Sequence, residues 1–552
     1  MTRPIHYRGQ PVSEGTGVGE IYLGDAPSGA VPVSPGDPPG QGRWTDDDVR
    51  AAFAAVARDR ADLAERLRAR GQDVQAGIVD IAALIAGDPA LVGPALEAVR
   101  AGADGPDAVW AAAEAQASVL AALPDPDLAQ RAGDVRQVAR AVADHLRGVT
   151  AYPAPAGAFI LIAQEVDPAD LIRLAERGLV GAVSVGGGAS SHAAIVARGL
   201  GLPMLVGADP LVLDAPDGHE AILDGAAGEL IVDPAEPELA AARAMTTVTM
   251  AAVAAGVGGA SPEVRTADGE PVTLLCNVAS AAETRLGLSG GASGVGLLRT
   301  EIGFTGASRW PSEADHLAQL EPILGLLEDR PAVVRLLDFS GDKVPPFLAG
   351  QSAKEQGLTA LLREPAVLAD QLRAIVLAGR KTRLSVLVPM VRTLEEVARV
   401  RAALAQASAE AGLDPPELGI MVEVAATAAA AAAFAPVVDF FSIGTNDLSS
   451  EVLGLDRADP GTRPALAADP RVLGLIERVV TAARATGVKV SVCGDAAADP
   501  QVLPLLIGVG VRTVSVGAAR VPQVAGWIAD TDGAAAAARA AQILHAAPRG
   551  DL

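Results

Sequence analysis

The second half of the chain repeats one pattern eight times: a short apolar run followed by a longer helical stretch. The runs lie at residues 272–278, 294–299, 332–338, 383–391, 418–423, 439–447, 488–494 and 513–517. Runs that are apolar almost throughout are typical of parallel strands buried on both faces. Eight such strands, each followed by a helix, predict a (β/α)8 barrel over residues 266–552, with a doubly wound open sheet as the alternative.

Two other patterns precede this segment. Residues 45–150 place apolar side chains at the spacing of amphipathic helices, with turn signals between them, and predict a helical bundle. Residues 151–235 alternate short apolar runs with helical stretches and predict a small α/β domain. Residues 236–265 are expected to form a helical linker to the barrel. The sequence therefore predicts a multidomain α/β protein.

Composition and charge narrow the classes of function. The 552 residues include 67 acidic and 44 basic side chains, a formal net charge of −23, with no block rich in Lys and Arg. A nucleic-acid or membrane-surface partner is therefore not expected. The longest apolar run, 425–438, is shorter than the ~20 residues that span a bilayer. With no signal-peptide pattern at the N-terminus and two cysteines in all, we expect a soluble, cytoplasmic enzyme or binding protein.

Polar side chains end several of the predicted strands, where a (β/α)8 barrel carries its functional groups. Glu423 and Asp447 would suit a hard cation such as Mg²⁺, which prefers carboxylate and substrate oxygens. Arg299, Arg335 and Arg457 offer the planar, bidentate recognition that phosphate and carboxylate groups favour. For any one of these residues the alternative is an ordinary ion pair in a loop.

Cys493 also lies at a predicted strand end, in the sequence SVCGD. There its thiol could donate a proton to a carbon centre. The alternative is that it is a small apolar core residue. Cys276, inside the first barrel strand, is expected to serve packing.

His192 follows a glycine-rich loop, GGGASS, and opens a helical segment. A helix N-terminus favours added negative charge, and a neutral imidazole is a competent nucleophile, so a phosphorylated histidine would be stabilised there. The alternative is a helix cap with a surface histidine. The other histidines are expected at the surface: His6, His145, His219, His316 and His545.

These segments resemble the signatures of enzymes that use phosphoenolpyruvate. The stretch around His192 is similar to their phosphohistidine signature, and GVGLLRTE, VPMV, IMVE, DFFSIGTNDL and CGD are similar to their barrel signature. The order of parts is that of Enzyme I of the sugar phosphotransferase system, the phosphoenolpyruvate–protein phosphotransferases. VSEGTGVGEIYL resembles that family's opening strand.

The resemblance implies a role for each matched residue. His192 falls on the phosphorylated histidine, and Cys493 on the cysteine that protonates the enolpyruvate carbon. Glu423 and Asp447 fall on the ligands of a Mg²⁺ cofactor. The residues implied to hold phosphoenolpyruvate are Arg299, Arg335, Asn446 and Arg457.

The resemblance also implies an architecture and partners. Residues 1–30 would supply the first strands of a swivelling phosphohistidine domain that residues 151–235 complete, and residues 45–150 would dock the phosphocarrier HPr. The family further implies a cytoplasmic homodimer that passes the phosphoryl group of phosphoenolpyruvate to HPr.

The chain departs from the family pattern in the segment AKEQGLTALLREP. Thr359 stands where the family has a substrate-binding arginine, and Arg363 is the nearest replacement in sequence. An alternative is therefore a degenerate paralogue that binds phosphoenolpyruvate or a partner without efficient turnover. A phosphoenolpyruvate synthase or dikinase is a less favoured alternative, because no glycine-rich phosphate loop precedes the histidine domain.

Overall fold

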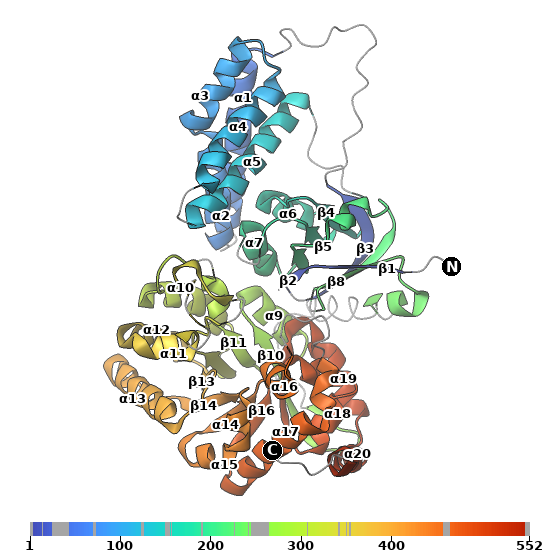
Figure 1. The fold of residues 1–552 in the computed structure, drawn as a ribbon, viewed down its shortest axis with the longest axis vertical. Helices are drawn as coiled ribbons and strands as arrows, with labels where there is room; N and C mark the ends of the chain where they lie inside the picture. Colours follow the sequence, from blue (N-terminus) through green and yellow to red (C-terminus); the bar gives the residue numbers. More distant parts are fainter. Residues whose placement is uncertain are drawn as a thin grey trace. The chain divides into compact units, whose positions relative to one another are not determined.

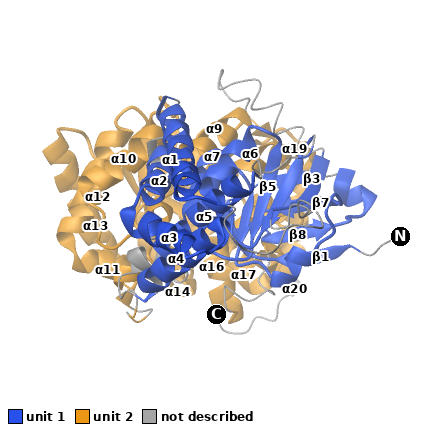
Figure 2. Cartoon of the chain, turned by 90° about the horizontal axis from the view of Figure 1, so that it is seen from above, with its two compact units in different colours: residues 1–246 blue, residues 247–552 orange. Residues whose placement is uncertain are grey.

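The computed structural model of the chain divides into two compact units, residues 1–246 and 247–552 (Figure 2). The structure describes residues 4–13, 15–24, 44–69, 73–122, 126–148, 155, 157–188, 191–225, 227–240, 242–243, 264–305, 307–340, 343–348, 350, 352, 355–455 and 464–546. Residue 457 and most of the expected linker, 236–265, lie outside these ranges.

The helical segment of the first unit forms a bundle. Its described helices are α1 (Asp46–Ala69), α2 (Asp73–Ala86), α3 (Pro89–Arg100), α4 (Gly105–Ala121) and α5 (Pro126–Arg147). A capping box starts α1: the Asp48 amide donates to Thr45 Oγ1 at 3.2 Å, and the Thr45 amide donates to Asp48 Oδ2 at 2.8 Å. The apolar faces meet in a core that includes Phe53, Leu91 and Val142.

One stretch of the described residues, Gln75–Arg100, is long and apolar enough to cross a membrane by length and composition. In the structure it comprises most of α2 and all of α3, separated at Gly87 and Asp88. Each helix is shorter than the ~20 residues that span a bilayer. Val79 and Leu91 lie in cores of the first unit, whereas Leu84 is 73% exposed.

A mixed sheet completes the first unit (Figure 1). Its central parallel strands are β3 (Thr16–Leu23), β4 (Phe159–Ala163), β5 (Leu179–Ser184) and β6 (Met204–Val206). Antiparallel strands flank them: β1 (Ile5–Arg8), β2 (Gln10–Ser13), β7 (Glu220–Asp224) and β8 (Glu229–Val232). The helices α6 (Pro168–Ala175) and α7 (His192–Leu200) pack on the sheet together with side chains from α1 and α2. The bundle is thus inserted between β3 and β4.

The glycines of β3 explain how the N-terminal segment joins this sheet. A Cβ atom on Gly17 would lie 2.3 Å from the Val180 carbonyl oxygen, and one on Gly19 would lie 2.6 Å from the Ala158 carbonyl oxygen. Only glycine allows the backbones to approach this closely.

The described strands of the second unit close into a barrel of eight parallel strands. They are β10 (Pro271–Val278), β11 (Val295–Arg299), β12 (Pro331–Arg335), β13 (Arg383–Val388), β14 (Glu417–Val422), β15 (Phe440–Ile443), β16 (Lys489–Val492) and β17 (Thr513–Gly517). The barrel closes because β10 pairs with both β11 and β17, with Thr273 opposite Thr513. The predicted barrel is confirmed, and the open-sheet alternative is wrong. A short strand, β9 (Val264–Arg265), pairs antiparallel with β10.

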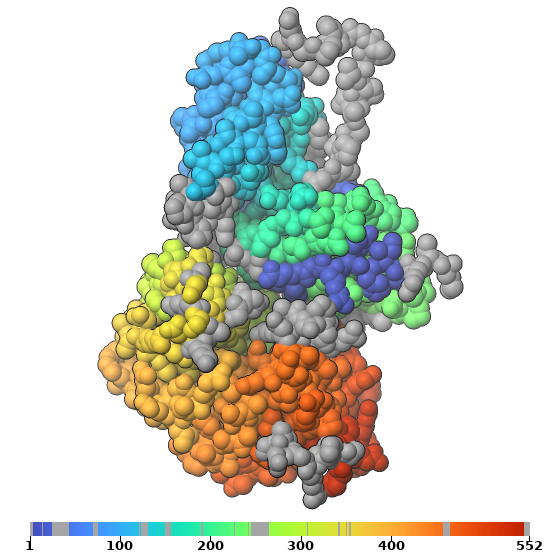
Figure 3. Space-filling model, in the orientation of Figure 1, coloured from blue at the N-terminus to red at the C-terminus, as the bar shows by residue number. Residues whose placement is uncertain are grey.

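Helices form the outer layer of the barrel (Figure 1), and the surface of this unit is coloured from yellow-green to red in Figure 3. The described ones are α9 (Ala281–Ser289), α10 (Glu313–Leu324), α11 (Leu358–Arg363), α12 (Pro365–Gly379), α13 (Leu394–Ala411), α14 (Ala425–Ala429), α15 (Ala431–Phe434), α16 (Thr445–Leu453), α17 (Pro470–Thr486), α18 (Leu503–Gly508), α19 (Val521–Asp530) and α20 (Gly533–Ala546). Side chains from alternate strand positions fill the interior, including Leu297, Leu387, Met421 and Phe440. The main core lies between strands and helices.

Several strands are shorter than the apolar runs predicted. The run 439–447 is a strand only to Ile443, because the chain turns at Gly444 and α16 begins at Thr445. Asn446 and Asp447 therefore lie in the first turn of a helix rather than on a strand. The surface assignment of His316 is also wrong: this residue of α10 is fully buried, with its ring centroid 5.1 Å from that of Phe304.

Candidate active site

His192 is the first residue of α7. Ser191 caps the helix, its Oγ accepting a hydrogen bond from the Ala194 amide at 3.3 Å. The glycines before it shape the loop: Gly187 has a φ of 81°, and a Cβ on Gly186 would lie 2.8 Å from Cγ of Glu165. The imidazole is thus held where unpaired backbone N–H groups favour an anion.

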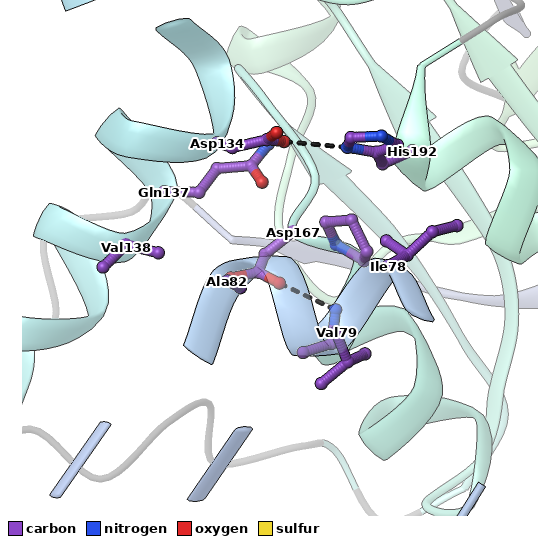
Figure 4. A pocket seen from close by; sticks show the side chains of 10 residues that line it. Ile78, Val79, Ala82, Asp134, Gln137, Val138, Asp167 and His192 are labelled. Carbon is purple, nitrogen blue, oxygen red and sulfur yellow. Dashed lines mark hydrogen bonds and ion pairs between the residues drawn. The ribbon is translucent and has the colours of Figure 1, made fainter. Parts of the chain in front are cut away.

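The imidazole has a carboxylate partner from the bundle. Asp134 of α5 lies with Oδ1 2.9 Å from His192 Nδ1 (Figure 4). The His192 side chain keeps 26% of its surface exposed, and that of Asp134 keeps 13%. The two line a small cavity of about 20 Å³ with side chains from α2 and α6, including Val79 and Ala169. The histidine is partly buried yet open to solvent.

In the second unit, Arg299 and Arg335 end neighbouring strands and are register partners between β11 and β12. Arg335 is buried and donates to Glu301 Oε1, and it lies 3.5 Å from Asp338 Oδ2. Burial works to lower the pKa of Arg335, but Glu301 and Asp338 outweigh it and raise that pKa above its usual value. Arg335 is therefore a fixed positive charge.

Lys343 joins this buried cluster from the loop after β12. Its Nζ donates to Asp338 Oδ2 at 2.8 Å and lies 3.8 Å from Glu301 Oε1. Burial works to raise the pKa of Asp338, but Lys343 and Arg335 hold it below its ordinary value. The cluster is a preorganised set of ionised groups.

Glu423 follows β14 and is 2% exposed. Burial, and then the carboxylates of Asp338 and Asp447, raise the pKa of Glu423 to about 8, against the opposing effect of Arg335. Crowded, buried carboxylate oxygens are donors that suit Mg²⁺, whose charge would relieve their repulsion. Among the described residues no group of three His, Cys, Asp or Glu side chains has the arrangement of a metal site. The Glu423–Asp447 pair fits Mg²⁺ provided that substrate or water completes the coordination.

Cys493 follows β16, points into the barrel interior with Met421 and Phe440, and is 5% exposed. Its Sγ donates a hydrogen bond to the Ile443 carbonyl oxygen at 3.6 Å. Burial raises the pKa of the thiol to about 11, so it stays protonated near neutral pH. Cys276 is fully buried in β10, and burial raises its pKa to about 12.

Asn446 links the first turn of α16 to the segment that follows β16. Its Nδ2 donates to Asp495 Oδ2 at 2.7 Å, and its Oδ1 accepts from the Asp495 amide at 2.9 Å. This pairing fixes the first turn of α16, which also carries Asp447. Arg457 lies outside the described residues.

The structure thus gathers Arg299, Arg335, Glu423, Asn446 and Cys493 at the ends or just beyond the ends of barrel strands. His192 belongs to the other unit. Arg363 is 60% exposed and donates to Glu355 Oε1 at 3.2 Å. Sequence reasoning did not single out Asp134, Glu301 or Lys343 as site residues. Glu301 carries a signal like that of Arg299, a charge at or just after the end of a buried strand, whereas nothing in the sequence marks Lys343, well beyond β12, or Asp134.

Comparison with known proteins agrees with this arrangement. Three family models match: the PEP-utilising enzyme N-terminal domain over residues 8–131, the mobile domain over 156–228 and the PEP-binding domain over 259–532. The chain belongs to the family of PEP-utilising enzymes.

Within that family the named relatives are phosphotransferases, as the sequence predicted. The phosphoenolpyruvate-protein phosphotransferase of Streptomyces coelicolor is 35% identical over 97% of this chain and 96% of its own. The multiphosphoryl transfer protein of Xanthomonas campestris is 38% identical over 75% of this chain and 51% of its own, so the match spans about half of that relative. A solved N-terminal domain of Enzyme 1 – Nitrogen is 30% identical and covers 44% of this chain and 99% of that one, with a TM-score of 0.32.

Proposed function

We propose that this protein transfers the phosphoryl group of phosphoenolpyruvate to its own His192, releasing pyruvate, and then to a histidine of the phosphocarrier HPr. This would be the first step of the sugar phosphotransferase system. The observation that carries the proposal is a solvent-accessible imidazole at a helix N-terminus in a chain that aligns over 97% of its length with a phosphoenolpyruvate-protein phosphotransferase.

Substrate binding is assigned to the barrel. Arg299 and Arg335, side by side in register, would hold the phosphoryl and carboxylate groups, with Asn446 and Arg457 completing the contacts. Glu423 and Asp447 would hold Mg²⁺, which when bound neutralises phosphoryl oxygens. The network of Glu301, Asp338 and Lys343 keeps Arg335 in place before substrate arrives.

The transfer itself needs one nucleophile and one acid. A lone pair of the neutral His192 imidazole attacks phosphorus, and the bond from phosphorus to the enol oxygen breaks. The Cys493 thiol then donates its proton to the methylene carbon of enolpyruvate, which gives pyruvate and a thiolate that water reprotonates. His192 and the barrel belong to different units, so the first unit must present the histidine to the barrel and then to HPr.

Three further parts of the proposal rest on the resemblance to Enzyme I. The helical bundle would dock HPr, the protein would act in the cytoplasm, and it would form a homodimer.

A second candidate is a paralogue that binds phosphoenolpyruvate without efficient turnover. The observation that favours it is Thr359 in α11, at the position where the family has an arginine. Arg363 does not supply a buried replacement, because it forms an exposed pair with Glu355.

Labelled phosphoenolpyruvate with Mg²⁺ tests both candidates. We expect acid-labile, base-stable label on the wild-type protein, none on His192→Ala, and onward transfer to purified HPr. The matched control is His219→Ala, since His219 also faces a carboxylate, Asp233 at 3.0 Å, but is 48% exposed and does not open a helix. Failure of the wild type to take up label while it still binds phosphoenolpyruvate would replace the first candidate by the second.

A further inference from the structure

The contact between Asp134 and His192 joins the bundle to the α/β part of the first unit. Asp134 lies in α5 and His192 in α7, 58 residues further along the chain. Figure 4 shows the two side chains pointing toward each other, with the carboxylate oxygen facing Nδ1. A side chain of α5 therefore contacts the imidazole of His192, which is the nucleophile in the proposed function.

The hydrogen bonds of Asp134 are unevenly distributed between its oxygens. Oδ1 is bonded to His192, whereas Oδ2 is buried and has no hydrogen-bond partner among the described residues. The Arg131 guanidinium on the same helix is 3.8 Å away, beyond hydrogen-bond distance. The histidine is thus the one hydrogen-bonding partner that the described structure gives this carboxylate.

A second histidine shows what an ordinary surface pair looks like in the same unit. His219 Nδ1 lies 3.0 Å from both oxygens of Asp233, with the side chains 48% and 27% exposed. Both members of the His192–Asp134 pair are more buried. Burial strengthens the effect of the Asp134 charge on its ring.

We propose that Asp134 is a positioning residue for phosphoryl transfer at His192, an inference that rests on the proposed function. The carboxylate accepts a hydrogen bond from Nδ1–H, which fixes the tautomer with its lone pair on Nε2. It also holds the plane of the ring while the chain carries it between phosphoryl donor and acceptor.

The charge balance of the step explains why a carboxylate suits this place. When Nε2 forms its bond to phosphorus, the ring keeps the proton on Nδ1 and becomes positively charged, and Asp134 compensates that charge. When the phosphoryl group leaves for an acceptor, the electron pair of the N–P bond returns to Nε2 and the ring leaves as neutral imidazole. Neither direction requires Nδ1 to gain or lose a proton.

The phosphoryl group itself stays away from the carboxylate. It is carried by Nε2, the ring nitrogen that does not face Asp134, and the N-terminal N–H groups of α7 favour its negative charge. The bundle thus contributes to the chemistry at His192 in addition to any docking role.

Asp134→Asn in the full-length protein tests the inference by rapid-quench labelling from phosphoenolpyruvate. Removing a charge-assisted hydrogen bond is expected to slow formation of phospho-His192 about 10- to 100-fold. The KM for phosphoenolpyruvate should stay within about twofold, since that substrate is assigned to the barrel. Asp144→Asn is the matched control: Asp144 is on the same helix and lies 3.9 Å from Arg147 rather than near the histidine.

Nitrogen-15 spectra of histidine-labelled protein supply a readout that a purely structural role would not move. In the wild type, His192 should show the Nδ1–H tautomer; in Asp134→Asn it should show a mixture or the other tautomer, and in Asp134→Glu mainly the wild-type form. Either an unchanged tautomer or an unchanged rate in Asp134→Asn would overturn the inference.

The outcomes separate this inference from the proposed function. A wild type that takes up no label contradicts the proposed function, whereas the tautomer measurement still reports on the Asp134 contact. If Asp134→Asn is labelled as fast as the wild type, the proposed function still holds but Asp134 has no part in it.

Discussion

Asp338 in the barrel and Asp170 in the first unit are both largely buried and lie beside arginines, but their pKa values move in opposite directions. Lys343 and Arg335 overcome the effect of burial and lower the pKa of Asp338. Burial, and then the neighbouring carboxylate of Asp167, raise the pKa of Asp170 to about 7. Neighbouring cations determine the direction of the pKa shift at Asp338, whereas burial determines it at Asp170.

The difference matches what each unit has to do in the proposed reaction. A substrate site gains from charges that are fixed before the substrate arrives, since no reorganisation is then needed in the transition state. The first unit must instead release its histidine to two different partners in turn. Its reactive side chain is accordingly 26% exposed and hydrogen-bonded at one nitrogen, rather than enclosed in a network.

The largest effect is expected from Arg335→Met, which would break the barrel network. Glu301 and Asp338 are 0% and 3% exposed, and the two carboxylates would be left to share one cation, Lys343. Leaving buried charges uncompensated costs about 3–5 kcal/mol, so urea unfolding of the barrel should shift by that amount and phosphoenolpyruvate-dependent labelling should disappear.

The control for this variant is an exposed ion pair in the same unit. Lys489 donates to Glu417 at 2.6 Å, with the two side chains 70% and 44% exposed. Lys489→Met should change stability by no more than about 1 kcal/mol and leave labelling intact. Equal losses in the two variants would show that the buried network is not preorganised as described.

A smaller effect is expected from Cys493→Ala, which sharpens the comparison by removing one acid from an otherwise intact site. Pyruvate formation should fall about 100-fold or more, while calorimetric binding of phosphoenolpyruvate persists. Cys276→Ala is the matched control, because its thiol is equally buried but lies within strand β10. If the two variants turn over alike, Cys493 serves packing and another group is the acid.

The barrel could be predicted from the sequence because strands buried on both faces are apolar almost throughout, as in VGLL of β11, where all four residues are buried. The ends of the strands were harder to predict from the sequence. In DFFSIGTND the predicted run included the polar residues that follow Ile443, but the chain turns at Gly444 and these residues begin α16. Local composition therefore identified the strand but not its last residue.

The positions of Asp134 and His316 were missed for a different reason. Asp134 faces His192 only because the fold brings a side chain of α5 to hydrogen-bond distance from the first residue of α7, and no local pattern records a contact between residues 58 positions apart. His316 was assigned to the surface as a polar residue, yet it lies on the buried face of α10 with Leu320 and Ile323. Periodicity places a side chain on a face, and a polar residue on the apolar face is easily overlooked.

The smallest effect concerns Asp170, where the first unit differs most clearly from the barrel. Around it lie Asp167, Arg60 of α1, Arg140 of α5 and Arg173, whose Nη1 is 3.5 Å from Asp170 Oδ1. An acid whose folded pKa is raised binds its proton more tightly when folded, so it stabilises the fold at low pH and loses that contribution as pH rises toward 7. Each pKa unit is worth about 1.4 kcal/mol, and the 14% exposure of Asp170 weakens the effect, so we expect about 2 kcal/mol between pH 4 and 8.

The measurement is hydrogen exchange of peptides from α6 and β4 in the full-length protein across that pH range, with Asp170→Asn as the test variant. Asparagine mimics the neutral acid, so the opening free energy of the wild type should fall relative to that of Asp170→Asn as pH rises from 4 to 8, by about 2 kcal/mol. Asp107→Asn, at an exposed position of α4, should run parallel to the wild type. Parallel curves for Asp170→Asn as well would mean that the arginines compensate Asp170 as fully as Lys343 and Arg335 compensate Asp338, and the contrast between the two units would vanish.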